Sequence, residues 1–354
     1  MLPLGVAPAM SFGSKAVDFG HFMLDAQQRD ALLASTPGVE KWIRPCLGGE
    51  GFLNGGMGWC LWLKGISPTE LRAMPAITER VELVRQERLR SKKLPTRESA
   101  KYSSLFGEDR QPDTAFLVIP KVSSERRQYL PLGFLTAEYI TTPSVLVVPD
   151  ATLFDFGILQ SAMHMSWMRY TCGRMKSDYQ YSNTIVYNNF PWPELTDIPS
   201  TVRTERSCPQ DGEVEVSPAH PSTPSAGAAY AQGERTREDQ RIRLVEGHKH
   251  RVAIEHAAQA VLDARAAFPE STLADLYDPL SMPPVLVKAH QALDRAVDAA
   301  YLAAEKIAGR KPPRLGSDAE RVAFLFERYQ QLTSLLPGKP AKSARRRRRT
   351  TGDA

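Results

Sequence analysis

Residues 145–169 read VLVVPDATLFDFGILQSAMHMSWMR, and this stretch decides the fold. Its first four residues are valine or leucine and stand before Pro149, which is typical of a short buried strand. Apolar residues then recur at helical spacing, which predicts a helix capped by Asp150 and carrying Leu153, Phe156, Leu159, Met163 and Trp167. A second apolar run at 116–119, before Pro120, predicts another buried strand. We therefore expect an α+β fold.

The same mixture of short strands and helices extends over residues 20–200, which we interpret as one domain. Within it, residues 71–90 have helical spacing, with Leu71, Ile77, Val81 and Val84 apolar among Arg and Glu. Residues 1–19 contain repeated Pro and Gly and show no element pattern. We expect them to be a lead-in that follows a domain of a larger protein.

The second half of the chain changes composition. Between 201 and 238 Pro, Ser, Gly, Thr and Glu dominate, which predicts a disordered linker or insertion. Residues 239–337 are rich in Ala and have helical spacing, which predicts a small helical bundle with Val245, Val252, His256 and Val261 on one buried face. Ser317 and Glu320 have capping-box spacing at the start of its last helix. The basic stretch 338–354 is predicted to be a disordered tail.

Composition narrows the class of protein. The 354 residues are 42% hydrophobic, and 45 Lys and Arg stand against 40 Asp and Glu, so the net charge of +5 argues only weakly for nucleic acid. No apolar stretch approaches the roughly 20 residues that cross a bilayer, and residues 1–10 lack the basic region that begins a signal peptide, so we expect a cytoplasmic protein without a membrane partner. The four cysteines lack metal-ligand spacing, which favours reduced thiols.

Residues that suggest catalysis have simpler interpretations. The glycines between 48 and 58 precede a strand-like run instead of following one, so they favour turns over a nucleotide cradle. In the sequence NNFPWP at 188–193, Phe190 separates Asn189 from Pro191, which breaks the Asn-Pro-Pro-aromatic pattern of amino-methyltransferases. His164 and Cys172 have no partner at useful spacing and are interpreted as packing residues. We predict no catalytic, metal or cofactor site in this chain.

Two kinds of polar stretch point instead to nucleic acid. Positive charge with interleaved hydroxyls is the mixture that phosphate contacts need, and it occurs at Arg85, Arg88, Arg90, Lys92, Lys93, Arg97 and Lys101. Side chains that pair with base edges gather at Arg174, Lys176, Asp178 and Gln180, and at Ser124, Arg126 and Arg127. A solvated helix face explains the first set equally well, and turn residues with local ion pairs explain the second.

These stretches also carry a family resemblance. The sequences GWCLWL at 58–63, VSSERR at 122–127 and YNNFPWP at 187–193 resemble the recognition region of MmeI-like type II restriction-modification enzymes. The helical half continues the likeness through LADLYDP at 273–279 and LDRAVD at 293–298. The family pattern has Arg where this chain has Gly58, which would remove one DNA contact.

The resemblance implies a function and a missing part. The family joins an endonuclease domain, a helical spacer and a methyltransferase domain that uses S-adenosylmethionine to a target-recognition region, and methylates adenine in double-stranded DNA. We therefore expect a sequence-specific DNA recognition module, with S-adenosylmethionine binding in the methyltransferase domain that this chain lacks. The alternatives are a complete DNA methyltransferase whose cofactor site is not evident, and a gene remnant or docking subunit that pairs with a separately encoded catalytic chain.

Overall fold

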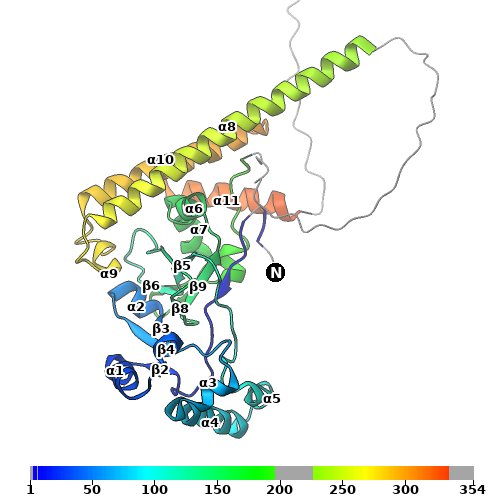
Figure 1. Cartoon of the computed structure of the whole chain (residues 1–354). Helices are drawn as coiled ribbons and strands as arrows, with labels where there is room; N and C mark the ends of the chain where they lie inside the picture. Colours follow the sequence, from blue (N-terminus) through cyan, green and yellow to red (C-terminus); the bar gives the residue numbers. More distant parts are fainter. Residues whose placement is uncertain (1–2, 6, 196–225, 335–354) are drawn as a thin grey trace, which may run out of the picture.

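The computed structural model describes residues 3–5, 7–195 and 226–334, with the side chains of 226–243 excepted. Small sheets with short helices lie below a layer of long helices (Figure 1). The predicted mixture of strands, helices and a helical bundle is confirmed, so the fold is α+β. No helix in the described ranges combines the length and apolar character that a membrane span requires.

The central sheet has the strand order β1-β9-β5-β7 and is antiparallel throughout. β5 and β9 are the two predicted buried strands. Alternate residues enter two cores: Leu117 and Val148 face the large cluster beneath the helices, and Val118 and Val147 face a small cluster closed by Phe52. The strands are β1 (Ser11–Phe12), β5 (Phe116–Pro120), β7 (Gly133–Leu135) and β9 (Val145–Pro149).

The predicted lead-in belongs to this sheet, because β1 pairs with β9 in the register Ser11 to Val147. A strand of two residues is too short to produce a sequence pattern. Part of the predicted lead-in thus contributes a strand to the central sheet, and the domain boundary near residue 20 stays a prediction.

The helix predicted after β9 divides into α6 (Leu153–Leu159) and α7 (Ala162–Thr171). Thr152 caps α6 in a capping box with Asp155, and Ser161 caps α7 by accepting the amide N–H of His164. Asp150 is not the cap, since its φ of 54° places it in the left-handed region two residues earlier.

A second sheet, with the order β2-β4-β3-β8, packs against α4 below the first. The predicted helix over 71–90 is interrupted, because Pro75 begins a new helix at a position where its missing N–H costs nothing. The elements here are β2 (Met23–Leu24), α1 (Ala26–Ser35), η1 (Glu40–Trp42), β3 (Ile43–Leu47), α2 (Gly49–Asn54), β4 (Gly58–Leu61), α3 (Pro68–Arg72), α4 (Pro75–Arg90), α5 (Leu94–Glu98), η2 (Ser99–Tyr102) and β8 (Ile140–Thr141).

The upper layer consists of α8 (Ala226–Ala266), α9 (Leu273–Leu276), α10 (Pro284–Ile307) and α11 (Asp318–Thr333). α8 and α10 lie side by side along the top (Figure 1). α8 begins inside the stretch predicted as linker, since Ala, Gln, Glu and Arg there have high helix propensity. Residues 201–225 of that predicted linker and the predicted tail at 338–354 lie outside the described residues.

The buried face of α8 differs from the predicted one. Val261 is buried as predicted, but Val245 and Val252 are 64% and 47% exposed, and the unpredicted Ile254 and Ala258 are buried in their place. Small alanines allow the helix to approach α6 closely: a Cβ added to Gly157 would lie 2.7 Å from Ile254 and 3.3 Å from Ala258. The prediction failed because it followed bulky apolar residues and ignored alanine.

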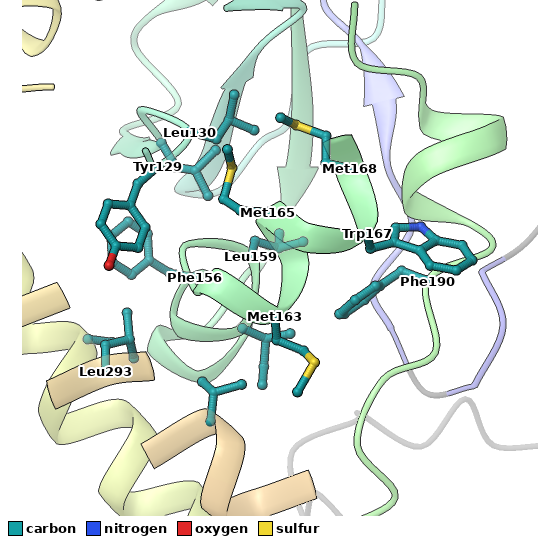
Figure 2. Packing of buried hydrophobic residues seen from close by; sticks show 14 of the residues in the cluster. Tyr129, Leu130, Phe156, Leu159, Met163, Met165, Trp167, Met168, Phe190 and Leu293 are labelled. Carbon is teal, nitrogen blue, oxygen red and sulfur yellow. The ribbon is translucent and has the colours of Figure 1, made fainter. Parts of the chain in front are cut away.

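One hydrophobic core joins the upper layer to the central sheet. It contains Leu117 and Leu146 from the sheet, Trp167 from α7 and Leu293 from α10. Figure 2 shows Leu293 directed from its helix towards the side of the cluster that holds Phe156 and Tyr129. The helical half therefore completes the core of the strand-rich half.

Candidate nucleic-acid interface

The two segments predicted to contact bases meet in one small sheet. β10 (Gly173–Met175) and β11 (Asp178–Gln180) form a hairpin, and β6 (Val122–Ser123) pairs with β11 in the register Tyr179 to Ser123. Lys176 occupies the turn with a φ of 57°, a conformation that non-glycine residues seldom adopt. The sheet thus brings the Arg174 segment next to the Ser124 segment, although about fifty residues separate them in the chain.

Arg174 is exposed but fixed in direction. Its guanidinium lies 4.2 Å from the ring centre of Tyr179, and its Nη1 donates to the carbonyl of Ser177 at 2.8 Å and to Glu125 at 3.3 Å. Lys176 is exposed at the tip of the hairpin. The tip therefore presents an oriented cation, Arg174, and an exposed cation, Lys176.

A second group of charges lies at the edge of the sheet that β6 forms. Arg127 donates to the Oγ of Ser123 at 3.3 Å, and burial lowers its pKa against the opposing effect of Asp178 and Asp278. Arg126 is exposed and lies 3.8 Å from Asp278 of the helical half. Positive and negative side chains thus alternate over this surface, a pattern that offers both donors and acceptors.

A cavity of about 690 Å³ opens between this sheet and α2. Its lining combines backbone, hydroxyl and charged groups, and it includes four positions that the sequence did not suggest, namely Glu50, Asn54, Lys121 and Ser144. Their absence from the prediction has a physical reason, since only the tertiary fold places α2 opposite the hairpin. The full lining is Gly49, Glu50, Leu53, Asn54, Lys121, Val122, Ser123, Ser124, Arg127, Pro143, Ser144, Met175 and Asp178.

Arg88 is a correction to the predicted phosphate contacts. Its side chain is 0% exposed, and its guanidinium donates to backbone carbonyls at Ala16, Val17, Ser99, Tyr102 and Leu105. With every nitrogen engaged and no route to solvent, it cannot reach a phosphate. Its hydrogen bonds instead connect α4 to residues 16–17 before the helix and to residues 99–105 after it.

The other predicted phosphate contacts remain at the surface. Arg85 pairs with Glu82, and Arg90 pairs with Glu87. Arg97 donates to the carbonyls of residues 91 and 92 in the turn between α4 and α5. Lys92 and Lys93 are exposed, and Lys101 lies over the ring of Tyr102. These residues belong to α4, α5 and the adjoining turns, which Figure 1 places at the lower end of the molecule, with the second sheet between them and β6.

The residues interpreted as packing have that role in the structure. His164 is buried, its Nε2 lies 2.9 Å from the hydroxyl of Tyr181, and burial lowers its pKa to about 3. Phe190 and Trp192 are buried, and Asn189 donates its amide group to the carbonyls of Thr184 and Ile185. Burial raises the pKa of Cys172.

The glycines at 48–58 also serve packing. The N–H of Gly49 donates to the Oγ of Ser144 at 2.9 Å, and a Cβ on Gly51 would lie 2.5 Å from the carbonyl oxygen of Gly56. Gly49 and Gly51 therefore take part in close packing between α2 and its neighbours.

Comparison with known proteins extends over nearly the whole chain. DNA methyltransferase A of Bacillus subtilis (strain 168) is 29% identical over 331 residues, which are 94% of this chain and 31% of that protein. The solved structure of the type IIL restriction-modification enzyme MmeI in complex with DNA is 36% identical, with a TM-score of 0.73, over 95% of this chain and 37% of that chain.

This chain therefore spans about a third of the length of these relatives. The target recognition domain of MmeI matches residues 2–194, and the C-terminal domain of MmeI matches residues 246–337. On these matches the chain belongs to the MmeI family and carries its target recognition and C-terminal domains.

Proposed function

We propose that this chain binds double-stranded DNA and reads its sequence with the β6–β11–β10 sheet. The observation that carries the proposal is the hairpin, which presents Arg174 and Lys176 at the surface and contributes Met175 and Asp178 to the adjoining cavity. A two-stranded ribbon is one of the few elements that the major groove admits. The MmeI relative, solved with DNA, supports the same partner.

The chemistry of the hairpin suits direct reading of base pairs. Lys176 offers donors that complement the O6 and N7 acceptors of guanine, and Asp178 offers an acceptor for the amino group of cytosine. Gln180 has the donor and acceptor pair that adenine requires, and Arg174 is already oriented by Tyr179. Ser124, Arg126 and Arg127 extend the reading surface across β6.

Phosphate contacts come from the surface cations of α4 and α5. In the described ranges no ion pair engages Lys92 or Lys93, so they are free to bind phosphate. Arg85 and Arg90 pair with carboxylates at the surface, where ion pairs contribute little, so phosphate can replace those partners. Arg97 and Lys101 form no ion pair within the described residues, and their charges are also available to phosphate. Release of counterions then makes affinity fall steeply with salt.

Selection of bound sequences from a random duplex library tests this function. We expect the wild-type chain to enrich one short site, and Lys176→Ala and Asp178→Ala to reduce discrimination at one base pair by roughly 5- to 150-fold, which corresponds to about 1–3 kcal/mol. Lys92→Ala should weaken binding to all duplexes alike, and Lys311→Ala, an exposed lysine of the helical half, is the control. Equal affinity for every duplex would refute sequence reading by this chain.

We also propose that the chain acts as the recognition part of an adenine-specific DNA methyltransferase of a restriction-modification system. On this proposal, S-adenosylmethionine binds to a methyltransferase domain outside the residues described here. Isothermal titration of this chain with S-adenosylmethionine should give no heat of binding. A saturable heat would favour the alternative of a complete methyltransferase.

A further inference from the structure

Two carboxylates of the C-terminal domain connect the two supports of the reading surface, one directly and one through an arginine. One support is the loop 124–130 that follows β6, and the other is α7, which leads directly into β10. On α10, Asp294 accepts the hydroxyl of Tyr129 from the loop at 2.6 Å through Oδ2, and the N–H of Ala162 at the start of α7 at 2.7 Å through Oδ1. This single side chain therefore fixes the loop relative to the beginning of α7.

Asp318 binds α7 nearer its other end and reaches the loop only through Arg169. It accepts the Oγ of Ser166 at 3.0 Å and forms an ion pair with Arg169, both on α7. Arg169 in turn donates through Nη2 to the carbonyl of Gln128 in the loop at 3.1 Å. The chain continues from Arg169 into β10 within four residues, so this contact lies immediately behind the hairpin.

The loop is also fixed by packing. Tyr129 is only 2% exposed, and its ring stacks on His290 at 4.0 Å between ring centres with planes 17° apart. His290 is held by the hydroxyl of Tyr277 at 2.9 Å. A side chain enclosed in this way has one position, which fixes the point from which Ser124, Arg126 and Arg127 extend.

We propose that Asp294 and Asp318 are positioning residues that set the distance between loop 124–130 and the β10–β11 hairpin, so that the C-terminal domain controls sequence preference without contacting a base. The inference rests on the proposed function. Hydrogen bonds to base edges require donor–acceptor distances within a few tenths of an ångström, because they weaken steeply outside about 2.7–3.2 Å. The β6–β11 ladder fixes the strands of the two reading segments but not the loop that follows β6, so loop 124–130 keeps that accuracy only if something else holds it relative to the hairpin.

Tyr129→Phe is the sharpest test, because it removes the hydroxyl that reaches Asp294 and keeps the ring on His290. Its matched control is Tyr301→Phe, which removes another buried tyrosine hydroxyl bond, to the carbonyl of Pro191 at 2.8 Å, away from the reading loop. Asp318→Ala is the second variant. In the full chain, affinity is measured for the selected duplex and for duplexes that differ from it by one base pair.

We expect Tyr129→Phe and Asp318→Ala to reduce discrimination by about fivefold or more, the effect of roughly 1 kcal/mol for one hydrogen bond, with affinity for unselected duplexes within about twofold of wild type. Tyr301→Phe should leave discrimination unchanged. The inference would be overturned if Tyr129→Phe and Asp318→Ala both kept wild-type discrimination, or if all three variants lost it equally.

A measurement without DNA separates this inference from the proposed function. In Tyr129→Phe and Asp318→Ala, the rate of amide hydrogen exchange of the free chain should rise in peptides covering 124–130 and 173–182. It should not rise there in Tyr301→Phe. If the wild-type chain shows no sequence preference, the proposed function fails, and exchange still decides whether the two carboxylates hold the segments. Unchanged exchange in both peptides would refute the positioning role.

Discussion

Replacing Leu293 by alanine tests whether the two family domains fold as one unit. Leu293 is 0% exposed on α10, and its Cδ1 lies next to Gly157 of α6 in the core that both halves share. The substitution removes three buried carbon atoms, worth about 0.8 kcal/mol each, or about 2.4 kcal/mol. With the cavity that remains, we expect the free energy of unfolding to fall by about 3 kcal/mol.

Amide hydrogen exchange followed by mass spectrometry locates the effect. A loss of about 3 kcal/mol in the free energy of unfolding corresponds to an increase of roughly a hundredfold in the rate of amide exchange that requires unfolding. We expect that increase in β9 and α7 peptides as well as in α10. Leu280→Ala is the matched control, because Leu280 is 88% exposed. Faster exchange confined to α8 and α10 would refute the reasoning and show that the helical half unfolds independently.

Three further substitutions test the packing and the titration of the core. Because burial lowers the pKa of His164 to about 3 from 6.5, the folded state binds fewer protons, and its stability should fall by up to about 1.4 kcal/mol per pH unit as the pH drops from 6.5 towards 3. His164→Gln should remove this part of the slope in urea melts, and identical slopes for variant and wild type would contradict the assignment. Gly157→Ala should cost about 1–3 kcal/mol, because the new Cβ would lie 2.7 Å from Ile254; an unchanged melting temperature would show that α6 can move away. Thr152→Ala should cost about 1 kcal/mol through loss of the α6 cap, measured against Thr136→Ala at an exposed loop position.

The sequence predicted the features that depend on local pattern. The runs at 116–119 and 145–148 became buried strands, because continuous apolar residues suit strands covered on both faces. The buried position of Arg88 was also available, since it shares the spacing of Ile77, Val81 and Val84 on one face of α4. Its charge suggested a surface role, and only the ring of carbonyls from distant segments makes its burial favourable.

Features set by tertiary contact could not be predicted. Nothing in the sequence between 122 and 180 indicates that β6 pairs with β11, because strands of two and three residues have no detectable period. The cavity beside α2 could not be predicted either, because it forms only once the pairing of β6 with β11 places the hairpin near α2. The residues suggested for base contact remain predictions, although the sheet brings their two segments together.

The hairpin carries its chemistry on residues that contribute little to the core. Arg174, Lys176 and Ser177 are exposed, while the inward-facing Tyr179 anchors the strand. Substitution at the outward positions therefore changes few buried contacts, and exposed substitutions usually alter stability by less than about 0.5 kcal/mol. On the proposed function, a lineage can consequently explore new DNA targets at the tip while the fold that presents it stays intact, which would separate the evolution of specificity from the maintenance of stability.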